Sequence, residues 1–256
     1  MSKFDFTKED IRNSLKNVGL VQGDSIFVHS NLGFFGTLDE INSKDDYCQS
    51  FKEAIFDVIG SNGTLIVPTF TYSFCNKENF DPAKTPSICG MFTEWIRTKT
   101  NCIRSEDANY SIAAIGQNAV FFTQDPPPHS FGENSFWARF LAKNGKFCNF
   151  NFDSASTFSH YVEKSLNVPY RYDKEFNGLV IKNNQSSKKS FFHFVRELKP
   201  EYEPQFEKFN QAAFKQNMVK TSNLGKGQIV CISASDSFNL IKNELIKDPF
   251  FLVKGI

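Results

Sequence analysis

His160 and Glu163 are the residues of this sequence whose types and spacing best suit acid–base chemistry. They stand three apart in Thr157-Phe-Ser-His-Tyr-Val-Glu163, so a helix here would bring the two side chains together on one face. A carboxylate beside an imidazole favours the protonated ring and fixes its orientation, which suits a base that takes a proton from an attacking group. Asp153, just upstream at a predicted strand end, is a second candidate to orient the ring. A surface ion pair with the same spacing is the alternative interpretation.

A second candidate segment follows the short apolar run Ser25–Val28. His29, Ser30, Asn31 and Leu32 come where this predicted strand ends. Backbone N–H groups at such an exit can hold an anion or a developing oxyanion. A structural hydrogen-bonding role for His29 is the alternative.

The third segment combines one cation with small polar residues. Arg104 is a candidate contact for a phosphate, and Ser105 and Ser111 would allow the close approach of a cofactor. Taken alone, the segment also fits a solvated arginine before an ordinary buried strand.

The elements that must position these residues alternate along the chain. Helices are expected over 8–18, 48–59, 91–98, 156–166 and 235–247, and strands over 25–29, 64–69, 111–115 and 146–152. Strands that alternate with helices predict a layered α/β domain. We expect one domain over 1–256, in which the less regular stretch at about 186–224 forms a small lid or subdomain.

Composition and motifs exclude several classes of protein. The chain lacks a Walker A motif, a dinucleotide-binding glycine motif and a nucleophile elbow. Its six cysteines form no C-x-x-C pair, and with four histidines no catalytic metal is expected. No apolar stretch would span a bilayer and no signal peptide is evident, so no membrane association and a cytoplasmic location are expected.

The charge is distributed unevenly. Residues 1–159 hold 14 Lys and Arg against 18 Asp and Glu, a balance of −4, whereas residues 160–256 hold 15 against 10, a balance of +5. The second part is therefore expected to favour an anionic ligand over a polycation. No basic run or basic-aromatic repeat occurs, so no nucleic-acid partner is expected.

Together and in order, these segments resemble the aminoglycoside 3-N-acetyltransferase-type family, also called the antibiotic N-acetyltransferases. The resemblance covers roughly residues 5–175. Its pieces are Asp24-Ser-Ile-Phe-Val-His-Ser-Asn-Leu32, Gly63-Thr-Leu-Ile-Val-Pro-Thr-Phe-Thr71, Phe80-Asp-Pro82 with Thr85-Pro-Ser87, Gly90-Met-Phe-Thr-Glu-Trp-Ile-Arg97, Arg104-Ser105, Ser111-Ile-Ala-Ala114, the segment 157–163 and Arg171-Tyr172.

The resemblance implies a layered α/β/α sandwich of the antibiotic N-acetyltransferase type with a small C-terminal lid or subdomain. It also implies acyl-CoA, either acetyl-CoA or a hydroxyacyl-CoA, as donor and the amine of a sugar as acceptor, with direct transfer and no covalent acyl-enzyme. His160 matches the family's catalytic histidine and Glu163 its acidic partner. His29, Ser30, Asn31 and Leu32 match the stretch whose backbone approaches the pantetheine and the thioester. Positions near the CoA arm or its phosphates are matched by Arg104, Ser105 and Ser111.

The chain also departs from the family pattern. The family often has a glycine-containing run where this chain reads Cys148-Asn-Phe-Asn-Phe-Asp153, so side chains there are expected to reshape the acyl pocket. The C-terminal region lacks the acid-rich stretches expected for a multiply charged aminoglycoside.

Three functions are weighed on this basis. The preferred one is acylation of a nucleotide-linked (dTDP or UDP) amino-deoxy sugar for a surface polysaccharide, because a basic region suits a pyrophosphate. Aminoglycoside 3-N-acetylation, which confers antibiotic resistance, is the alternative. A non-catalytic CoA- or sugar-binding protein is the third, and retention of both His160 and Glu163 weighs against it. The sequence is compatible with a homodimer.

Overall fold

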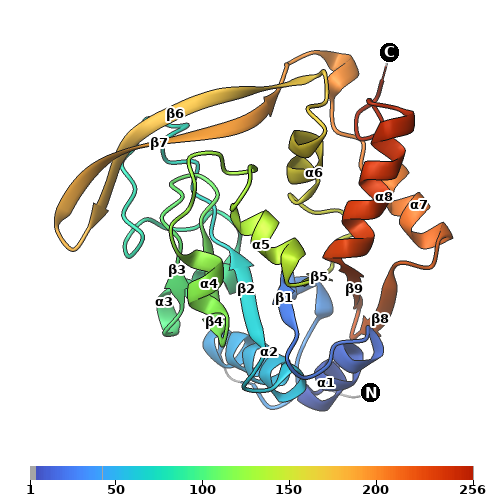
Figure 1. Cartoon of the computed structure of the whole chain (residues 1–256). Helices are drawn as coiled ribbons and strands as arrows, with labels where there is room; N and C mark the ends of the chain where they lie inside the picture. Colours follow the sequence, from blue (N-terminus) through green and yellow to red (C-terminus); the bar gives the residue numbers. More distant parts are fainter. Residues whose placement is uncertain (1–3, 42, 256) are drawn as a thin grey trace.

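A mixed sheet of seven strands forms the centre of the computed structural model, which describes residues 4–41 and 43–255. Its strand order is β3-β4-β2-β1-β5-β9-β8 (Figure 1). β1 pairs in parallel with β2 and β5, whereas the outer pairings are antiparallel. The strands are β1 (Ser25–Phe27), β2 (Thr64–Pro68), β3 (Ile103–Arg104), β4 (Ile112–Gly116), β5 (Lys146–Phe150), β8 (Lys220–Leu224) and β9 (Gly227–Ser233).

Both faces of this sheet are buried. Ile26 and Val28 of the β1 region belong to one hydrophobic core, and Phe27, which lies between them, belongs to the other. Because successive side chains of a strand point to opposite faces, a strand buried on both faces reads as a continuous apolar run. This explains why the sequence of 25–28 lacks polar alternation.

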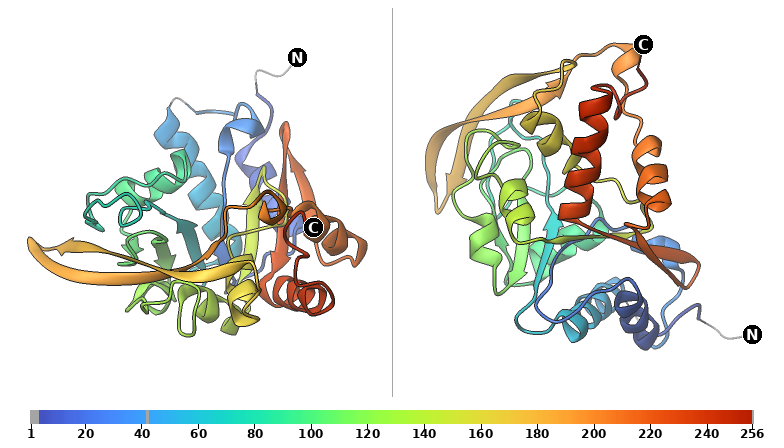
Figure 2. Two further views of the ribbon diagram at one scale, coloured as in Figure 1. Left: turned by 90° about the horizontal axis from the view of Figure 1, so that it is seen from above. Right: turned by 45° about the vertical axis from the view of Figure 1, so that its right-hand side comes forward.

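Helices cover the two faces. The first core includes side chains of α1 (Lys8–Asn17), α2 (Lys44–Ile59) and α3 (Met91–Lys99), and the second includes those of α4 (Ala119–Thr123), α5 (Phe136–Ala142), α6 (Ser159–Ser165), α7 (Glu207–Lys215) and α8 (Ala234–Lys247). Figure 2 shows α1 and α2 on one side of the sheet and α8 on the other. The predicted layered α/β fold is therefore confirmed.

Several helix ends follow from local sequence. Thr7 and Asp10 form a capping box at α1, in which the Thr7 hydroxyl accepts from the Asp10 N–H at 3.2 Å and the Asp10 carboxylate accepts from the Thr7 N–H at 2.8 Å. Ser233 caps α8 by accepting from the Asp236 N–H at 2.9 Å. No helix within residues 4–41 and 43–255 is both long and apolar enough to cross a membrane.

A two-stranded arm, formed by β6 (Arg171–Lys182) and β7 (Gln185–Arg196), reaches away from the main sheet (Figure 1). Asn183 and Asn184 turn the chain with φ values of 51° and 62°, a conformation that asparagine tolerates well. The expected lid or subdomain at 186–224 is not one unit. Its residues are shared among β7, the short helix η2 (Pro200–Tyr202), α7 and β8.

Candidate active site

A cavity of about 250 Å³ lies at the end of the parallel strands β1 and β5. His29 follows β1, Phe152 follows β5, and His160 comes from α6. Because the carboxyl ends of neighbouring parallel strands meet at one edge of a sheet, residues 120 or more positions apart share this cavity. Its lining residues are His29, Phe152, Ala155, Ser156, Thr157, His160 and Phe206.

Glu163 holds the His160 ring. The Nδ1 atom of His160 lies 2.6 Å from Oε2 of Glu163, as the spacing of three residues on a helix predicts. The Glu163 side chain is only 1% exposed, and its carboxylate also accepts from the Tyr170 hydroxyl at 2.6 Å. The Arg171 Nε atom lies 2.9 Å from Glu163 Oε2, so a buried cation shares the same charge.

These contacts leave His160 neutral. Burial lowers the pKa of His160, and the positive charge of Arg171 lowers it further, against the opposing effect of Glu163. Burial alone would raise the pKa of Glu163, but the hydrogen bond from His160 and the charge of Arg171 outweigh burial and lower it. A lowered pKa favours the neutral ring near pH 7, and the Nε2 atom of His160 has no hydrogen-bond partner among residues 4–41 and 43–255.

His29 has a different partner. Its Nδ1 atom lies 3.0 Å from the side-chain oxygen of Asn149 on β5, and burial lowers the pKa of the ring. His29 and His160 thus line one cavity, each with its Nδ1 atom hydrogen-bonded to a neighbouring side chain.

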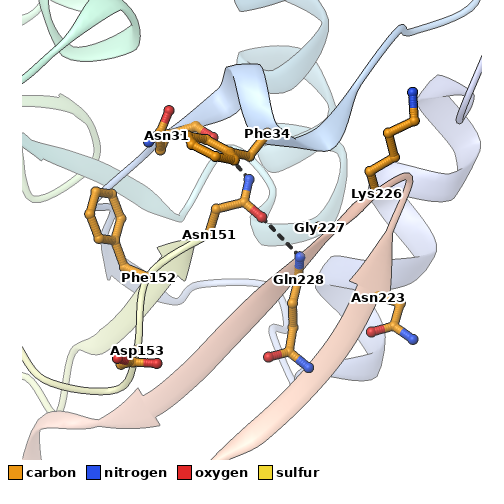
Figure 3. A pocket seen from close by; sticks show the side chains of 9 residues that line it. All are labelled: Asn31, Phe34, Asn151, Phe152, Asp153, Asn223, Lys226, Gly227 and Gln228. Carbon is orange, nitrogen blue, oxygen red and sulfur yellow. Dashed lines mark hydrogen bonds between the residues drawn. The ribbon is translucent and has the colours of Figure 1, made fainter.

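Asp153 lies outside this arrangement. The Nδ1 atom of His160 is taken by Glu163, whereas the backbone carbonyl of Asp153 accepts from the Asn149 side chain at 2.5 Å. Asp153 lines a second, larger cavity of about 620 Å³, together with Asn31, Phe34, Asn151, Phe152, Asn223, Lys226, Gly227 and Gln228 (Figure 3).

Phe152 lines both cavities. In Figure 3, Phe34 and Phe152 lie toward one end of the larger cavity and Lys226 toward the other. The side chain of Asn151 connects two segments of the cavity wall. Its amide nitrogen donates to the Asn31 carbonyl at 2.9 Å, and its amide oxygen accepts from the Gln228 N–H at 3.0 Å. The two cavities therefore meet at one aromatic side chain.

The residues after His29 have separate environments. Ser30 pairs with Phe150 at the sheet edge, and its hydroxyl is buried with no hydrogen-bond partner among the described residues. Asn31 lines the larger cavity. Leu32 begins the short helix η1 (Leu32–Phe35) and is buried in the core.

Arg104 ends β3, and Ser105 and Ser111 lie in the loop that connects β3 to β4. Arg104 donates to the backbone carbonyls of Thr69, Pro82 and Thr85 and to the hydroxyls of Thr69 and Ser111. Burial lowers the pKa of its guanidinium to about 10. The Ser105 hydroxyl accepts from the Ile112 N–H at 3.0 Å, and the Ser111 hydroxyl donates to the Thr69 carbonyl at 2.6 Å. This group connects strands and a loop and is not among the lining residues of the His29–His160 cavity.

A family model described as aminoglycoside 3-N-acetyltransferase matches residues 27–245. The chain belongs to this family. The matched range begins at the last residue of β1 and includes α6 and the arm, so it contains both histidines of the cavity.

Individual members of the aminoglycoside 3-N-acetyltransferase family are similar over part of their length. Aminoglycoside N(3)-acetyltransferase IV of Salmonella sp is 28% identical over 174 residues, which cover 66% of this chain and 62% of that protein. Aminoglycoside N(3)-acetyltransferase IX of Micromonospora chalcea is 25% identical over 55% of each chain. This chain thus spans less than two thirds of the length of either relative.

Solved structures of the family share the fold. The crystal structure of aminoglycoside acetyltransferase AAC(3)-Xa has a TM-score of 0.81 at 20% identity and covers 93% of this chain and 92% of its own. AAC-IIIb in its binary complex with CoASH has a TM-score of 0.80 at 20% identity, covering 94% and 96%. AAC-VIa bound to sisomicin has a TM-score of 0.80 at 21% identity, covering 94% and 97%.

These comparisons correct the preferred function. The relatives are aminoglycoside acetyltransferases, so acylation of a nucleotide-linked amino-deoxy sugar for a surface polysaccharide was the wrong choice. The charge argument failed for a structural reason. Arg171 is paired with Glu163, and Lys182 and Lys189 of the arm pair with Glu106 in the loop after β3. The lining of the His29–His160 cavity contains neither Lys nor Arg.

Sequence reasoning missed four contributors to the site. Tyr170 and Arg171 contact Glu163 because the chain turns at Asn167, where φ is 49°. No periodicity in the local sequence predicts these contacts. Phe206 comes from a distant irregular segment. Asn149 did leave a signal, because it is a lone polar residue within the apolar strand Phe147–Phe150.

Proposed function

We propose that this chain transfers the acetyl group of acetyl-CoA to an amino group of an aminoglycoside, the 3-amino group in the naming of its family. The observation that carries the proposal is the His160–Glu163 pair at the wall of a cavity, in a chain that belongs to this family. The names of its relatives support acetyl transfer, and the CoASH and sisomicin complexes of similar folds support the two substrates.

The proposed chemistry begins with the acceptor ammonium. A protonated amine has no lone pair, so it must lose a proton before it can attack a thioester. His160, neutral and fixed through Nδ1 by Glu163, takes that proton on Nε2. The nitrogen then attacks the thioester carbonyl, and the C–S bond breaks to release CoA. Both substrates held in one site supply most of the remaining rate gain through proximity.

We further propose that acetyl-CoA occupies the larger cavity, with its thioester directed past Phe152 toward His160. Phe34 and Phe152 provide exposed aromatic surface for an adenine or for the pantetheine chain. Lys226, at the far end, is 69% exposed and could turn from its ion pair with Asp5 to a phosphate.

An acidic segment supports a cationic acceptor, and it corrects the expectation that the C-terminal region lacks acid-rich stretches. Residues 197–207 contain Glu197, Glu201, Glu203 and Glu207 against Lys199, and Phe206 of this segment lines the cavity. Glu197 and Glu203 are in ion pairs, which leaves Glu201 and Glu207 without an ion-pair partner among residues 4–41 and 43–255. Carboxylates on a segment that contributes Phe206 to the cavity lining would attract a ligand that carries several ammonium groups.

The test is an acceptor panel. The protein is incubated with acetyl-CoA and sisomicin, gentamicin or kanamycin, and thiol release is measured together with the mass of the product. We expect acceptor-dependent thiol release and a product that has gained one acetyl group. An otherwise identical acceptor already acetylated on its 3-amino group should be inert. Thiol release that no aminoglycoside increases would contradict the proposal.

A further inference from the structure

Asn149 is a buried amide whose orientation is fixed by its neighbours. It is 0% exposed, and its side-chain nitrogen donates to the carbonyls of Asp153 and Ala155 at 2.5 and 3.4 Å. Backbone carbonyls only accept, so this end of the side chain must be the NH₂ group. The oxygen of Asn149 must therefore face the Nδ1 atom of His29, 3.0 Å away.

This orientation determines the tautomer of His29. An amide oxygen can only accept a hydrogen bond, so the hydrogen lies on Nδ1 of His29 and the lone pair of the neutral ring lies on Nε2. Nε2 has no hydrogen-bond partner within residues 4–41 and 43–255, and His29 lines the cavity that His160 also lines. The cavity thus contains two imidazoles in the same protonation pattern.

The other groups around His29 do not add charge to it. The rings of Phe27 and Phe152 lie 4.9 and 6.5 Å from its centre. His160 is the other titratable side chain in the lining, and behind it the charge of Glu163 is shared with Arg171. Burial, which disfavours the charged ring, therefore dominates and keeps the pKa of His29 low.

We propose that His29, held by Asn149 with its hydrogen on Nδ1, is a second proton acceptor of this cavity and a catalytic residue of the transfer. The inference rests on the proposed acetyl transfer. That reaction removes two protons from one nitrogen, because an ammonium becomes a secondary amide. A single imidazole would have to release the first proton before it could take the second.

His160 and His29 take the two protons of the acceptor nitrogen one after the other. Nε2 of His160 takes the first proton from the ammonium, and the freed lone pair forms the N–C bond while the carbonyl π electrons move to oxygen. Nε2 of His29 then takes a second proton from the positively charged nitrogen. The oxygen electrons reform the carbonyl, and the C–S bond breaks with its electron pair on sulfur. The thiolate takes the proton from His160, and His29 releases its proton to water, so the products are one amide, one CoA thiol and one proton.

The first arm of the test needs no activity. Two-dimensional ¹H–¹⁵N spectra of the histidine rings distinguish the two neutral tautomers, and a His29→Gln variant assigns the signals of His29. We expect the Nδ1–H tautomer for His29 at pH 7 in the unmodified protein. An Nε2–H tautomer or a charged ring at that pH would overturn the inference, whatever the substrate.

The second arm compares variants of similar shape. Asn149→Leu removes the acceptor for Nδ1, and Asn210→Leu makes the same change at another buried asparagine, whose oxygen accepts from Ser154 at 2.8 Å. We expect that in Asn149→Leu the His29 ring no longer prefers the Nδ1–H tautomer. We also expect kcat to fall about tenfold, while the KM for acetyl-CoA stays within about twofold. His29→Gln should lower kcat at least as much. Asn210→Leu should change neither the tautomer nor kcat by more than about twofold.

The outcomes separate the two proposals. If the unmodified protein acetylates no aminoglycoside, the proposed function fails, and the spectra still decide the state of His29. If it does acetylate one and His29→Gln retains the full kcat, the second proton acceptor is refuted while the proposed function stands. A kcat loss in Asn149→Leu without any change in the ring spectra would also refute it, because the effect would then be structural.

Discussion

At the residue scale, the site depends on how one buried carboxylate is shared. Glu163 contacts His160, Tyr170 and Arg171, so its charge does not act on the imidazole alone. The helical spacing predicted the His160–Glu163 pair, because residues three apart on a helix are neighbours. It did not predict Arg171, which reaches Glu163 only through tertiary structure. Glu163 was expected to favour the protonated ring, yet burial and Arg171 lower the pKa of His160 instead.

This sharing predicts the pH dependence of acetyl transfer. Because His160 must be neutral to accept a proton, the rate should fall as the pH drops through its pKa, which lies below the ordinary value of about 6.5. Arg171→Met removes the cation that lowers this pKa, so the acidic limb should move to higher pH. The measurement is kcat/KM against pH for both proteins, with transfer shown to limit the rate. An unchanged limb would contradict the role given to Arg171.

At the scale of elements, β2, β3 and β4 are tied together by Arg104. Arg104 was correctly predicted to precede a buried strand. The sequence pattern is the same, however, whether the guanidinium faces solvent, binds a phosphate or hydrogen-bonds within the protein. Only the folded chain shows that its donors are used by Thr69, Pro82, Thr85 and Ser111. Its guanidinium also lies 5.0 Å from the centre of the Phe80 ring.

Removing the hydrogen bonds of Arg104 should lower the stability of the fold. Arg104→Met leaves several buried carbonyls without donors, so we expect the free energy of unfolding to fall by about 3 kcal/mol or more. Arg104→Lys should recover little of this loss, because one ammonium cannot reach acceptors on three segments. Urea unfolding measures the effect, and the KM for acetyl-CoA of the folded variant is the second readout. A large rise in that KM with little loss of stability would instead favour the phosphate contact that the family resemblance implies.

At the scale of the whole molecule, local patterns predicted the inner elements better than the outer ones. The continuous apolar runs at 25–28 and 64–67 indicated buried strands, and the apolar spacing in 48–59 indicated a helix. The order of the sheet was not readable, since β5 pairs with β9 some 80 residues later along the chain. The length of the arm was also not readable, because its two paired strands mix exposed, partly buried and buried side chains without a regular alternation.

Net charge over a long segment was a poor guide for a related reason. It adds together side chains that the fold separates, such as Arg171, which is buried against Glu163 at the start of β6, and Lys189, which is exposed on β7. Ion pairs and cavity linings depend on tertiary structure, so the net charge of +5 over residues 160–256 predicted neither of them.

Three histidines that are buried or half-buried predict how the stability of the fold depends on pH. Burial lowers the pKa of His29, His160 and His193, so the unfolded chain binds these protons more readily than the folded protein. Stability should therefore be fully present above pH 6.5 and should be lost as the pH falls toward the folded pKa values, at about 1.4 kcal/mol for each unit of difference.

Urea unfolding at pH 7.5 and pH 5 tests this expectation. We expect a lower free energy of unfolding at pH 5, and a smaller difference between the two conditions in His193→Gln, which removes one of the three groups. His193 lies outside the lining of the His29–His160 cavity and contacts Asn109 at 3.0 Å. Equal stability at both pH values would show that the histidines are not held neutral by the fold.

The proposed role of His160 as the base of an acetyl transfer is tested most directly by the single-turnover rate of His160→Asn. Acetyl-CoA and sisomicin are mixed with excess protein, and acetylated product is measured over time. We predict a rate about a hundredfold or more below that of the unmodified protein, with the Kd for acetyl-CoA changed by no more than about twofold. His129→Asn, at an exposed histidine beside Asp173, is the matched control and should keep its rate. A His160→Asn rate within a few-fold of the unmodified protein would contradict the account.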